Sequence, residues 1–277
     1  MKVGIIGLGT IGIKMVEYLS DKGFQIVAYN WRSIEEKKSK FSSNLDKKIK
    51  YEKIGMNQMD LIKSRIHFTE ILTDLSEVDL IIDSSIESYE VKVRIYKQLK
   101  EENISKVIAC TTSSLNLETL GNSYDSSLFV GVHFFNPPTK MRLVEISFLK
   151  ENKEPTKAIV YEFLGMLDDK KIIELPLMQG YIVNRLLFLY MNAAFRIMQE
   201  YDLSPEVIDE AMKAGTNMPM GPCELNDYVG TDITLSILNE LKCAFGADLY
   251  EPCPILNNMV ASGKLGRKSK YGFYNYI

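Results

Sequence analysis

Near the N-terminus, a short run of β-forming residues, 3–6, leads directly into a glycine-rich turn, Gly7-Leu8-Gly9-Thr10-Ile11-Gly12. The turn has the spacing G-x-G-x-x-G, and the apolar positions from Gly12 to Ser20 predict a helix after it. In such a strand-turn-helix the glycines permit a tight turn, close approach of the backbone to a pyrophosphate, and close packing of helix on strand. The N–H groups at the helix start then bind the phosphates. We therefore predict a dinucleotide site with contacts from Gly7, Gly9, Thr10, Ile11 and Gly12.

Strands and helices alternate through the rest of the first half of the chain. Further strands are predicted at residues 24–29, 66–68, 80–82, 107–110, 128–132, 143–148 and 171–176. Such alternation is typical of a parallel sheet that is covered on both faces. From Gly180 on, the pattern becomes helical. We therefore predict an α/β fold: a Rossmann-like dinucleotide-binding domain with an inserted helical pair (1–179), followed by an all-α substrate and dimerisation domain (180–277).

The second half contains recognisable helix boundaries. A long, largely apolar helix is predicted from Tyr181 to Tyr201, and another begins at Ser204-Pro205-Glu206, with serine as cap, and ends at Gly215. Pro222 and Asp232 are expected to begin two more. Long apolar helices in a small domain bury their excess surface against a partner, so we expect a homodimer formed through this domain.

Residues 33–64 are longer than a plain crossover and are rich in lysine. Apolar residues at 41, 45, 49 and 51 are spaced for one helical face, which predicts the inserted helical pair. The plain interpretation of the lysines is a solvated charged surface. The alternative is a basic arm for a phosphorylated ligand, including Lys47, Lys48 and Lys50.

The composition excludes several classes of function. With 33 Lys and Arg against 36 Asp and Glu, the net charge of −3 argues against a nucleic-acid-binding protein. No apolar run is long enough to span a membrane, and the N-terminus does not have the pattern of a signal peptide. The four cysteines form no C-x-x-C pair and there are two histidines, so we expect no metal site. Reduced thiols in a cytoplasmic protein are the expectation.

The residues after the second strand bear on the choice of dinucleotide. An acid at this place usually binds the ribose 2′-hydroxyl of NAD, whereas this chain has Asn30-Trp31-Arg32-Ser33. A carboxylate would repel a 2′-phosphate, but Asn30, Arg32 and Ser33 can donate hydrogen bonds to one. The cofactor is therefore expected to be NAD(P), with NADP mildly favoured and NAD remaining an alternative.

A histidine and a glutamate are placed for acid–base chemistry. His133 ends a predicted strand and is followed by Phe134-Phe135-Asn136-Pro137-Pro138, and a returning strand would bring Glu145 beside it. A carboxylate against an imidazole fixes its tautomer and stabilises the imidazolium. We predict hydride transfer from a secondary alcohol to nicotinamide, with His133 as the general base. The other histidine, His67, is interpreted as structural.

These motifs resemble the 3-hydroxyacyl-CoA dehydrogenases, the family that includes 3-hydroxybutyryl-CoA dehydrogenase. The resemblance extends in order over nearly the whole chain. It rests on residues 7–12, Thr112-Ser113-Ser114-Leu115, 133–137, Leu143-Val144-Glu145, Gly180-Tyr181-Ile182-Val183-Asn184-Arg185, Pro219-Met220-Gly221-Pro222, Asp227-Tyr228-Val229-Gly230, Gly266-Arg267-Lys268 and Gly272-Phe273-Tyr274.

The resemblance implies roles for individual residues. His133 would be the base and Glu145 its orienting partner, while Ser113 and Asn184 would bind the 3-oxygen of the substrate. The cofactor would contact residues beyond the glycine turn: Ser84, Glu87, Lys92, Thr111 and Asn136. The inserted helical pair would face the nucleotide part of coenzyme A. The chain departs from the family at Asn30, where an acid is usual, and at Thr111, where asparagine is usual.

Three hypotheses for the function remain. The leading one is an NAD(P)-dependent dehydrogenase that interconverts a 3-hydroxyacyl thioester of coenzyme A, such as 3-hydroxybutyryl-CoA, and its 3-oxo form. Its variant uses a hydroxyacyl group on an acyl carrier protein, as in the synthesis of extender units. The second is a free hydroxy-acid or sugar-acid dehydrogenase, which commonly relies on a lysine where this chain has Asn184. The third, a nucleotide-sensing protein without activity, predicts the loss of site residues that are all present.

Overall fold

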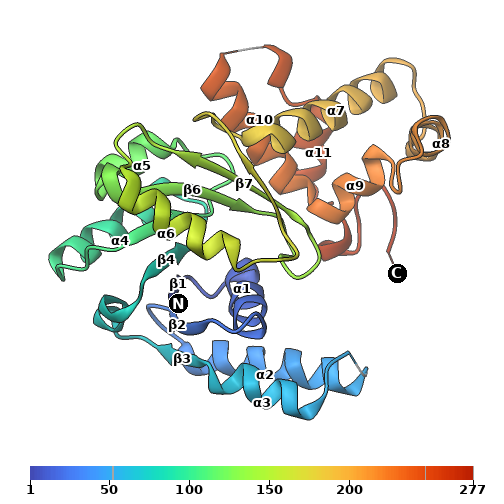
Figure 1. Ribbon diagram of the computed structural model, residues 1–277. Coiled ribbons are helices and arrows are strands. Elements are labelled where there is room, and N and C mark those ends of the chain that lie inside the picture. The colour runs from blue at the N-terminus through green and yellow to red at the C-terminus, as the bar shows by residue number, and fades with distance from the viewer. Residues whose placement is uncertain (52, 247, 277) are drawn as a thin grey trace. The chain divides into compact units, whose positions relative to one another are not determined.

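The computed structural model describes residues 1–51, 53–246 and 248–276 (Figure 1). The chain divides into two compact units, Met1–Met178 and Gln179–Ile277, each described by itself below. No helix within the described ranges is long and apolar enough to cross a membrane. Across the same ranges, no three His, Cys, Asp or Glu side chains are grouped to hold a metal ion.

The first unit is built on one eight-stranded sheet with the order β3-β2-β1-β4-β5-β6-β7-β8. Its strands are β1 (Lys2–Ile6), β2 (Gln25–Tyr29), β3 (Ile66–Thr69), β4 (Leu80–Asp83), β5 (Val107–Cys110), β6 (Phe129–Phe134), β7 (Leu143–Phe148) and β8 (Lys171–Glu174). Neighbouring strands are parallel except β6 and β7, which are antiparallel. The predicted α/β fold is therefore confirmed, and each predicted strand is present.

Helices connect these strands. They are α1 (Thr10–Asp21), α2 (Ile34–Lys50), α3 (Met56–Ser64), α4 (Tyr89–Glu101), α5 (Leu117–Ser123) and α6 (Glu154–Gly165), with short 3-10 helices η1 (Leu72–Glu77) and η2 (Ser126–Leu128). The predicted inserted pair is confirmed as α2 and α3. Their apolar faces, through Phe41 and Ile62 among others, belong to the core of this unit.

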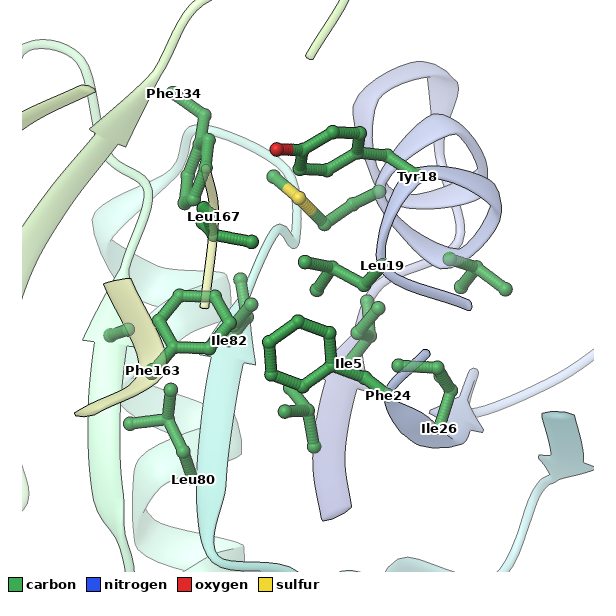
Figure 2. Packing of buried hydrophobic residues seen from close by; sticks show 14 of the residues in the cluster. Ile5, Tyr18, Leu19, Phe24, Ile26, Leu80, Ile82, Phe134, Phe163 and Leu167 are labelled. Atoms are coloured by element: carbon green, nitrogen blue, oxygen red, sulfur yellow. The ribbon is translucent and has the colours of Figure 1, made fainter. Parts of the chain in front are cut away.

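The core of the first unit lies between the sheet and helices α1 and α6. Alternate strand residues such as Ile5 and Ile82 face this layer, where Figure 2 shows them beside Leu19 of α1 and Phe163 of α6. The ring of Phe163 packs on that of Phe24 with centroids 5.4 Å apart. The opposite face of the sheet packs on α4 and α5. Both faces are therefore covered, which leaves the strand ends as the place for a site.

The second unit is helical. It contains α7 (Tyr181–Glu200), α8 (Pro205–Thr216), α9 (Pro222–Val229), α10 (Thr231–Phe245) and α11 (Pro254–Ala261), with η3 (Asp248–Tyr250) and η4 (Arg267–Ser269). Two details of the predicted boundaries are wrong. Gly215 does not end α8, because the helix continues to Thr216 and Asn217 adopts the left-handed conformation. Ser204 precedes α8, but its side chain makes no capping hydrogen bond.

The C-terminal segment is fastened to α9 by one buried carboxylate. Asp227 accepts the backbone N–H groups of Phe273 and Tyr274, each at 2.9 Å. A Cβ atom at Gly272 would lie 2.1 Å from Asp227 Oδ1, so the chain passes this point only as glycine. The motifs around Asp227 and Gly272 are therefore parts of one structural contact.

Candidate active site

The predicted site residues of the first unit follow the carboxyl ends of neighbouring strands. The glycine turn follows β1, Asn30 follows β2, Ser84 follows β4 and Thr111 follows β5. His133 lies at the end of β6, next to β5 in the sheet. Carboxyl ends of parallel strands meet at one edge, which is where ligands bind in open α/β sheets.

The glycine turn has the geometry of a phosphate-binding loop. Gly7 has a φ of +86°, and a Cβ atom there would lie 2.5 Å from the Cα of Ser85. A Cβ at Gly12 would collide with the carbonyl oxygen of Gly7. By contrast, a Cβ at Gly9 would meet no described atom within 4 Å. The protein itself therefore requires Gly7 and Gly12, whereas the space over Gly9 fits the approach of a ligand to the backbone.

The start of α1 completes this cradle. Among the described residues, no side chain caps α1, and its first turn contains no acid. The partial positive charge of the helix start is therefore available to a pyrophosphate. The hydroxyl of Ser84 donates to the carbonyl oxygens of Ile6 and Gly7, at 3.0 and 2.9 Å. The residues present thus fit a dinucleotide, and Ser84 braces the loop that would hold it.

Asn30 links the glycine turn to the turn after β2, where the adenosine end of a dinucleotide would lie. Its Oδ1 accepts the backbone N–H of Leu8 at 3.0 Å, and its Nδ2 donates to the carbonyl oxygen of Arg32 at 2.6 Å. Arg32 is exposed, and its guanidinium lies 4.1 Å from the centre of the Trp31 ring. Ser33 has a left-handed backbone just before α2. The amide of Asn30 therefore holds the glycine turn and the turn after β2 together, a role that the sequence did not reveal.

His133 and Glu145 are directly opposite each other on the antiparallel pair β6 and β7. The Nδ1 atom of His133 lies 2.9 Å from a carboxylate oxygen of Glu145, and both side chains are buried. This contact confirms the pairing predicted from the strand-turn-strand pattern. The ring of Phe135 packs on the imidazole with centroids 4.6 Å apart. The imidazole is thus oriented by a carboxylate on one side and an aromatic ring on the other.

Two lysines hold the turn that follows His133. The ammonium of Lys14, on α1, donates to Asn136 Oδ1 at 3.1 Å. The ammonium of Lys170 donates to the carbonyl oxygen of Pro138 at 2.7 Å. Burial lowers the pKa of Lys14. Because α1 begins at the glycine turn, Lys14 connects the predicted dinucleotide loop to the predicted catalytic strand. Neither lysine was identified from the sequence.

Glu87 fastens the loop that contains Ser113. Its Oε1 accepts the N–H of Ser113 at 2.7 Å, the N–H of Ser114 at 3.1 Å and the hydroxyl of Thr112 at 2.7 Å. The Ser114 hydroxyl adds a fourth contact at 3.1 Å. The structure therefore gives Glu87 a role in shaping the Ser113 loop, in addition to the cofactor contact expected for it.

Lys92 lies inside the first unit. Its ammonium donates to Asp83 at 3.0 Å, and both side chains are fully buried. The hydroxyl of Tyr96 also donates to Asp83 and lies 3.5 Å from Cys110 Sγ. Burial alone would raise the pKa of Asp83, but Lys92 and hydrogen bonds from Ser85 and Tyr96 lower it. Burial raises the pKa of the Cys110 thiol to about 11. Lys92 is thus the counter-ion of the buried Asp83. The contact of Lys92 with a cofactor stays a prediction.

The remaining predicted residues have different positions. The hydroxyl of Thr111 donates to the carbonyl oxygen of Asp83 at 3.0 Å. In the lysine-rich arm, Lys47 and Lys50 are exposed, whereas Lys48 pairs with the buried Glu17 of α1. Asn184 is buried in the first turn of α7, in the second unit. The structure therefore pairs His133 with Glu145 and places the glycine turn, Asn30, Ser84 and Thr111 at the ends of strands in one sheet. Lys92 lies in the core, the arm lysines lie on α2, and Asn184 belongs to the second unit.

Comparison with known proteins gives a consistent result over the whole chain. The model of the 3-hydroxyacyl-CoA dehydrogenase NAD-binding domain matches residues 2–175, and that of the C-terminal domain of the same family matches residues 180–276. A probable 3-hydroxybutyryl-CoA dehydrogenase of Deinococcus radiodurans is 34% identical over 283 residues, covering 100% of both chains. The 3-hydroxybutyryl-CoA dehydrogenase of Clostridioides difficile is 34% identical over 280 residues, covering 100% of this chain and 99% of its own.

Solved structures give the same picture. The crystal structure of (S)-3-hydroxybutyryl-CoA dehydrogenase from Ralstonia eutropha superposes with a TM-score of 0.90 at 34% identity. It covers 100% of this chain and 99% of that one. The likeness therefore extends through both units.

Proposed function

Because the chain belongs to the 3-hydroxyacyl-CoA dehydrogenase family, we propose that it interconverts a 3-hydroxyacyl thioester of coenzyme A and its 3-oxo form. A short acyl chain, as in 3-hydroxybutyryl-CoA, is the substrate that the named relatives favour. The observation that carries the proposal is the buried His133–Glu145 pair at the edge of the sheet that also presents the glycine turn. A base without a dinucleotide loop, or a loop without a base, would not support this reaction.

The proton chemistry follows from the contact between His133 and Glu145. A carboxylate accepts a hydrogen bond, so Nδ1 of the neutral imidazole carries the proton and Nε2 is left as the acceptor. In the oxidative direction, Nε2 takes the proton of the substrate hydroxyl while the C–H bond electrons leave as a hydride and a carbonyl forms. A bound nicotinamide dinucleotide supplies the hydride acceptor. Glu145 stabilises the imidazolium that results, and in reduction the same proton returns to the substrate oxygen.

Ser113, Asn184 and Asn136 are assigned supporting roles in this proposal. Ser113 is assigned a hydrogen bond to the 3-oxygen, where charge changes during the reaction. Asn184, in the first turn of α7, keeps the substrate-binding role predicted for it. Asn136 contacts the cofactor from the turn that Lys14 holds. The glycine turn and the start of α1 hold the pyrophosphate. For the ribose end, Asn30 and Arg32 support a mild preference for NADP, because neither contributes a negative charge.

We expect the protein to work as a homodimer formed through the helical unit. Large apolar side chains are exposed on α7 and on α8, including Leu186, Ile197 and Val207. A second copy is the partner that this surface supports. The four cysteines are free thiols, which supports the cytoplasm as the location.

The choice of carrier can be tested by offering one acyl group in three forms. Reduction of acetoacetyl-CoA, acetoacetyl-acyl carrier protein and free acetoacetate would be compared by the loss of reduced-nicotinamide absorbance. We expect the highest kcat/KM with the CoA thioester, because the chain belongs to the 3-hydroxyacyl-CoA dehydrogenase family and its named relatives are 3-hydroxybutyryl-CoA dehydrogenases. The exposed Lys47 and Lys50 do not decide between the carriers, because they would attract an acidic carrier protein as well as the phosphates of CoA. A higher value with the carrier protein, or turnover of only the free acid, would replace the CoA proposal with the corresponding alternative.

Glu87 is expected to position the loop that contains Ser113. Replacing Glu87 with Ala removes the acceptor of four hydrogen bonds from the Ser113 loop and is expected to lower kcat by about 10- to 100-fold. Glu87→Gln retains an acceptor oxygen and should recover most of this loss. Steady-state kinetics of acetoacetyl-CoA reduction and the Kd of the dinucleotide would be measured for both variants.

The matched control is Glu90→Gln, which alters an exposed carboxylate three residues away that accepts a hydrogen bond from the Ser88 hydroxyl at 2.7 Å. A positioning role leaves the dinucleotide Kd unchanged in both Glu87 variants. If the Kd instead rises as much as kcat falls, Glu87 acts chiefly as a cofactor contact.

A further inference from the structure

Glu70 lies beside the turn that follows β2. It comes directly after β3, whose last residue, Thr69, is in register with Tyr29 at the end of β2. The backbone N–H of Asn30 donates to the carbonyl oxygen of Thr69 at 3.1 Å. The acid that binds the adenosine ribose usually follows β2, at the position of Asn30. Glu70 therefore lies at the same edge of the sheet, at the end of the neighbouring strand.

The carboxylate of Glu70 occupies the start of α2. Its Oε1 accepts the N–H of Ile34, the first residue of that helix, at 2.8 Å. Ser33 precedes the helix but makes no side-chain cap. A helix start at this position is a ready site for an additional phosphate, because its N–H groups and dipole attract anions. Here a carboxylate already fills it.

The charge around this helix start is negative as well. Glu35 and Glu36 lie in the first turn of α2. Burial raises the pKa of the Tyr29 phenol, and the negative charge of Glu70 raises it further, so the field of Glu70 reaches the end of β2. A 2′-phosphate bound at this turn would thus be attracted by the guanidinium of Arg32 and repelled by the carboxylate of Glu70.

We propose that Glu70 is a specificity-determining residue for the dinucleotide. Its carboxylate, which follows β3 and not β2, disfavours a 2′-phosphorylated ribose and so limits the preference for NADP that Arg32 provides. This inference rests on the proposed dinucleotide-dependent function. Glu70 would thus take the place of the acid that is missing after β2. The protein would then accept both NAD and NADP, with the balance set by two opposed charges.

The variant Glu70→Gln separates the charge of this residue from its capping function. The glutamine oxygen still accepts the N–H of Ile34, so the start of α2 is kept, while the negative charge is removed. The control is Glu118→Gln, which removes an exposed acid from the first turn of another helix in the same unit, α5. A third variant, Arg32→Gln, removes the opposing positive charge.

Binding can be measured without any reaction. Trp31 is the one tryptophan in the sequence, is 66% exposed and lies against Arg32, so its fluorescence should report occupancy of the adenosine end. Titration with NADP⁺ and with NAD⁺ gives the two Kd values for each variant. In Glu70→Gln we expect about tenfold tighter NADP⁺ binding, with the Kd of NAD⁺ within about threefold of the wild type. Arg32→Gln should weaken NADP⁺ alone, and Glu118→Gln should change neither.

Two outcomes would overturn the inference, and they can be told apart. If both dinucleotides bind but their ratio of Kd values is the same in Glu70→Gln as in the wild type, Glu70 does not discriminate between them, and the proposed function is unaffected. If the wild-type protein binds neither dinucleotide, the inference and the proposed function fail together. An equal shift in Glu118→Gln would attribute the effect to net charge and reject a specific role for Glu70.

Discussion

Replacing His133 with Gln is expected to lower kcat for acetoacetyl-CoA reduction by about 10²- to 10⁴-fold. Glutamine fills similar space and keeps a polar end, but it cannot hold and release a proton. His133 is 4% exposed and paired with Glu145, so the substitution removes the oriented base without opening the site to bulk solvent. The dinucleotide Kd should be unchanged, since its binding rests on the glycine turn. Steady-state kinetics and binding titrations would be measured on the same preparation.

The chain provides a matched control, because His67 is the other of its two histidines. The sequence predicts a structural role for His67, which lies on the edge strand β3 with its Nε2 3.0 Å from Asp74 Oδ2. The presence of that partner shows that a histidine–carboxylate pair alone does not identify the base. His67→Gln should leave kcat within about twofold of the wild type. Unchanged turnover in His133→Gln would remove this residue as the base.

Replacing Asp83 with Asn is expected to destabilise the first unit by about 3–5 kcal/mol. The substitution leaves the fully buried ammonium of Lys92 without its counter-ion. It also weakens the hydrogen bonds from Tyr96 and Ser85 that converge on this carboxylate. Urea unfolding, followed by far-ultraviolet circular dichroism, would measure the difference.

The dependence on pH gives this prediction a second readout. The folded-state pKa of Asp83 is lowered, so the stability from its charge is fully present above the ordinary carboxyl pKa, near 4. It is lost as the pH falls from there through the lowered value. The wild type should therefore exceed Asp83→Asn in stability at neutral pH, and the difference should shrink below about pH 4.

Two controls separate a buried pair from a general loss of charge. The double variant Asp83→Asn, Lys92→Met removes both charges and should recover a large part of the stability, because no uncompensated ion remains. Glu77→Gln breaks the exposed pair between Glu77 and Lys2 and should cost less than about 1 kcal/mol. Equal stability of Asp83→Asn and the wild type would show that Lys92 does not depend on Asp83.

The strands and the main chemical pair were predictable because their signals are local. Short apolar and β-branched runs predicted all eight strands, and a strand, a turn and a returning strand have few ways to pair. The separation of twelve positions between His133 and Glu145 therefore sufficed to place them opposite each other. The glycine turn was predictable for the same reason, since it lies between one strand and one helix.

Other features depend on contacts between distant parts of the chain. Lys92 belongs to a charged stretch of helix α4, and no sequence pattern reveals that its ammonium points inward to Asp83. Likewise, no sequence pattern shows that Glu87 accepts the backbone N–H of Ser113, or that Glu70 accepts the backbone N–H of Ile34. Helix ends were also less predictable than helices, as at Gly215, because asparagine can adopt the left-handed conformation two residues later.

The most direct test of the proposed reaction is its stoichiometry with acetoacetyl-CoA. Wild-type protein would be mixed with acetoacetyl-CoA and a limiting amount of reduced dinucleotide, NADH or NADPH, and the products would be separated by chromatography. We predict one 3-hydroxybutyryl-CoA formed for each reduced dinucleotide consumed, at the same rate. The absence of that product with either dinucleotide, despite measurable dinucleotide binding, would contradict the assignment of His133 and Glu145 to a 3-hydroxyacyl-CoA dehydrogenase reaction.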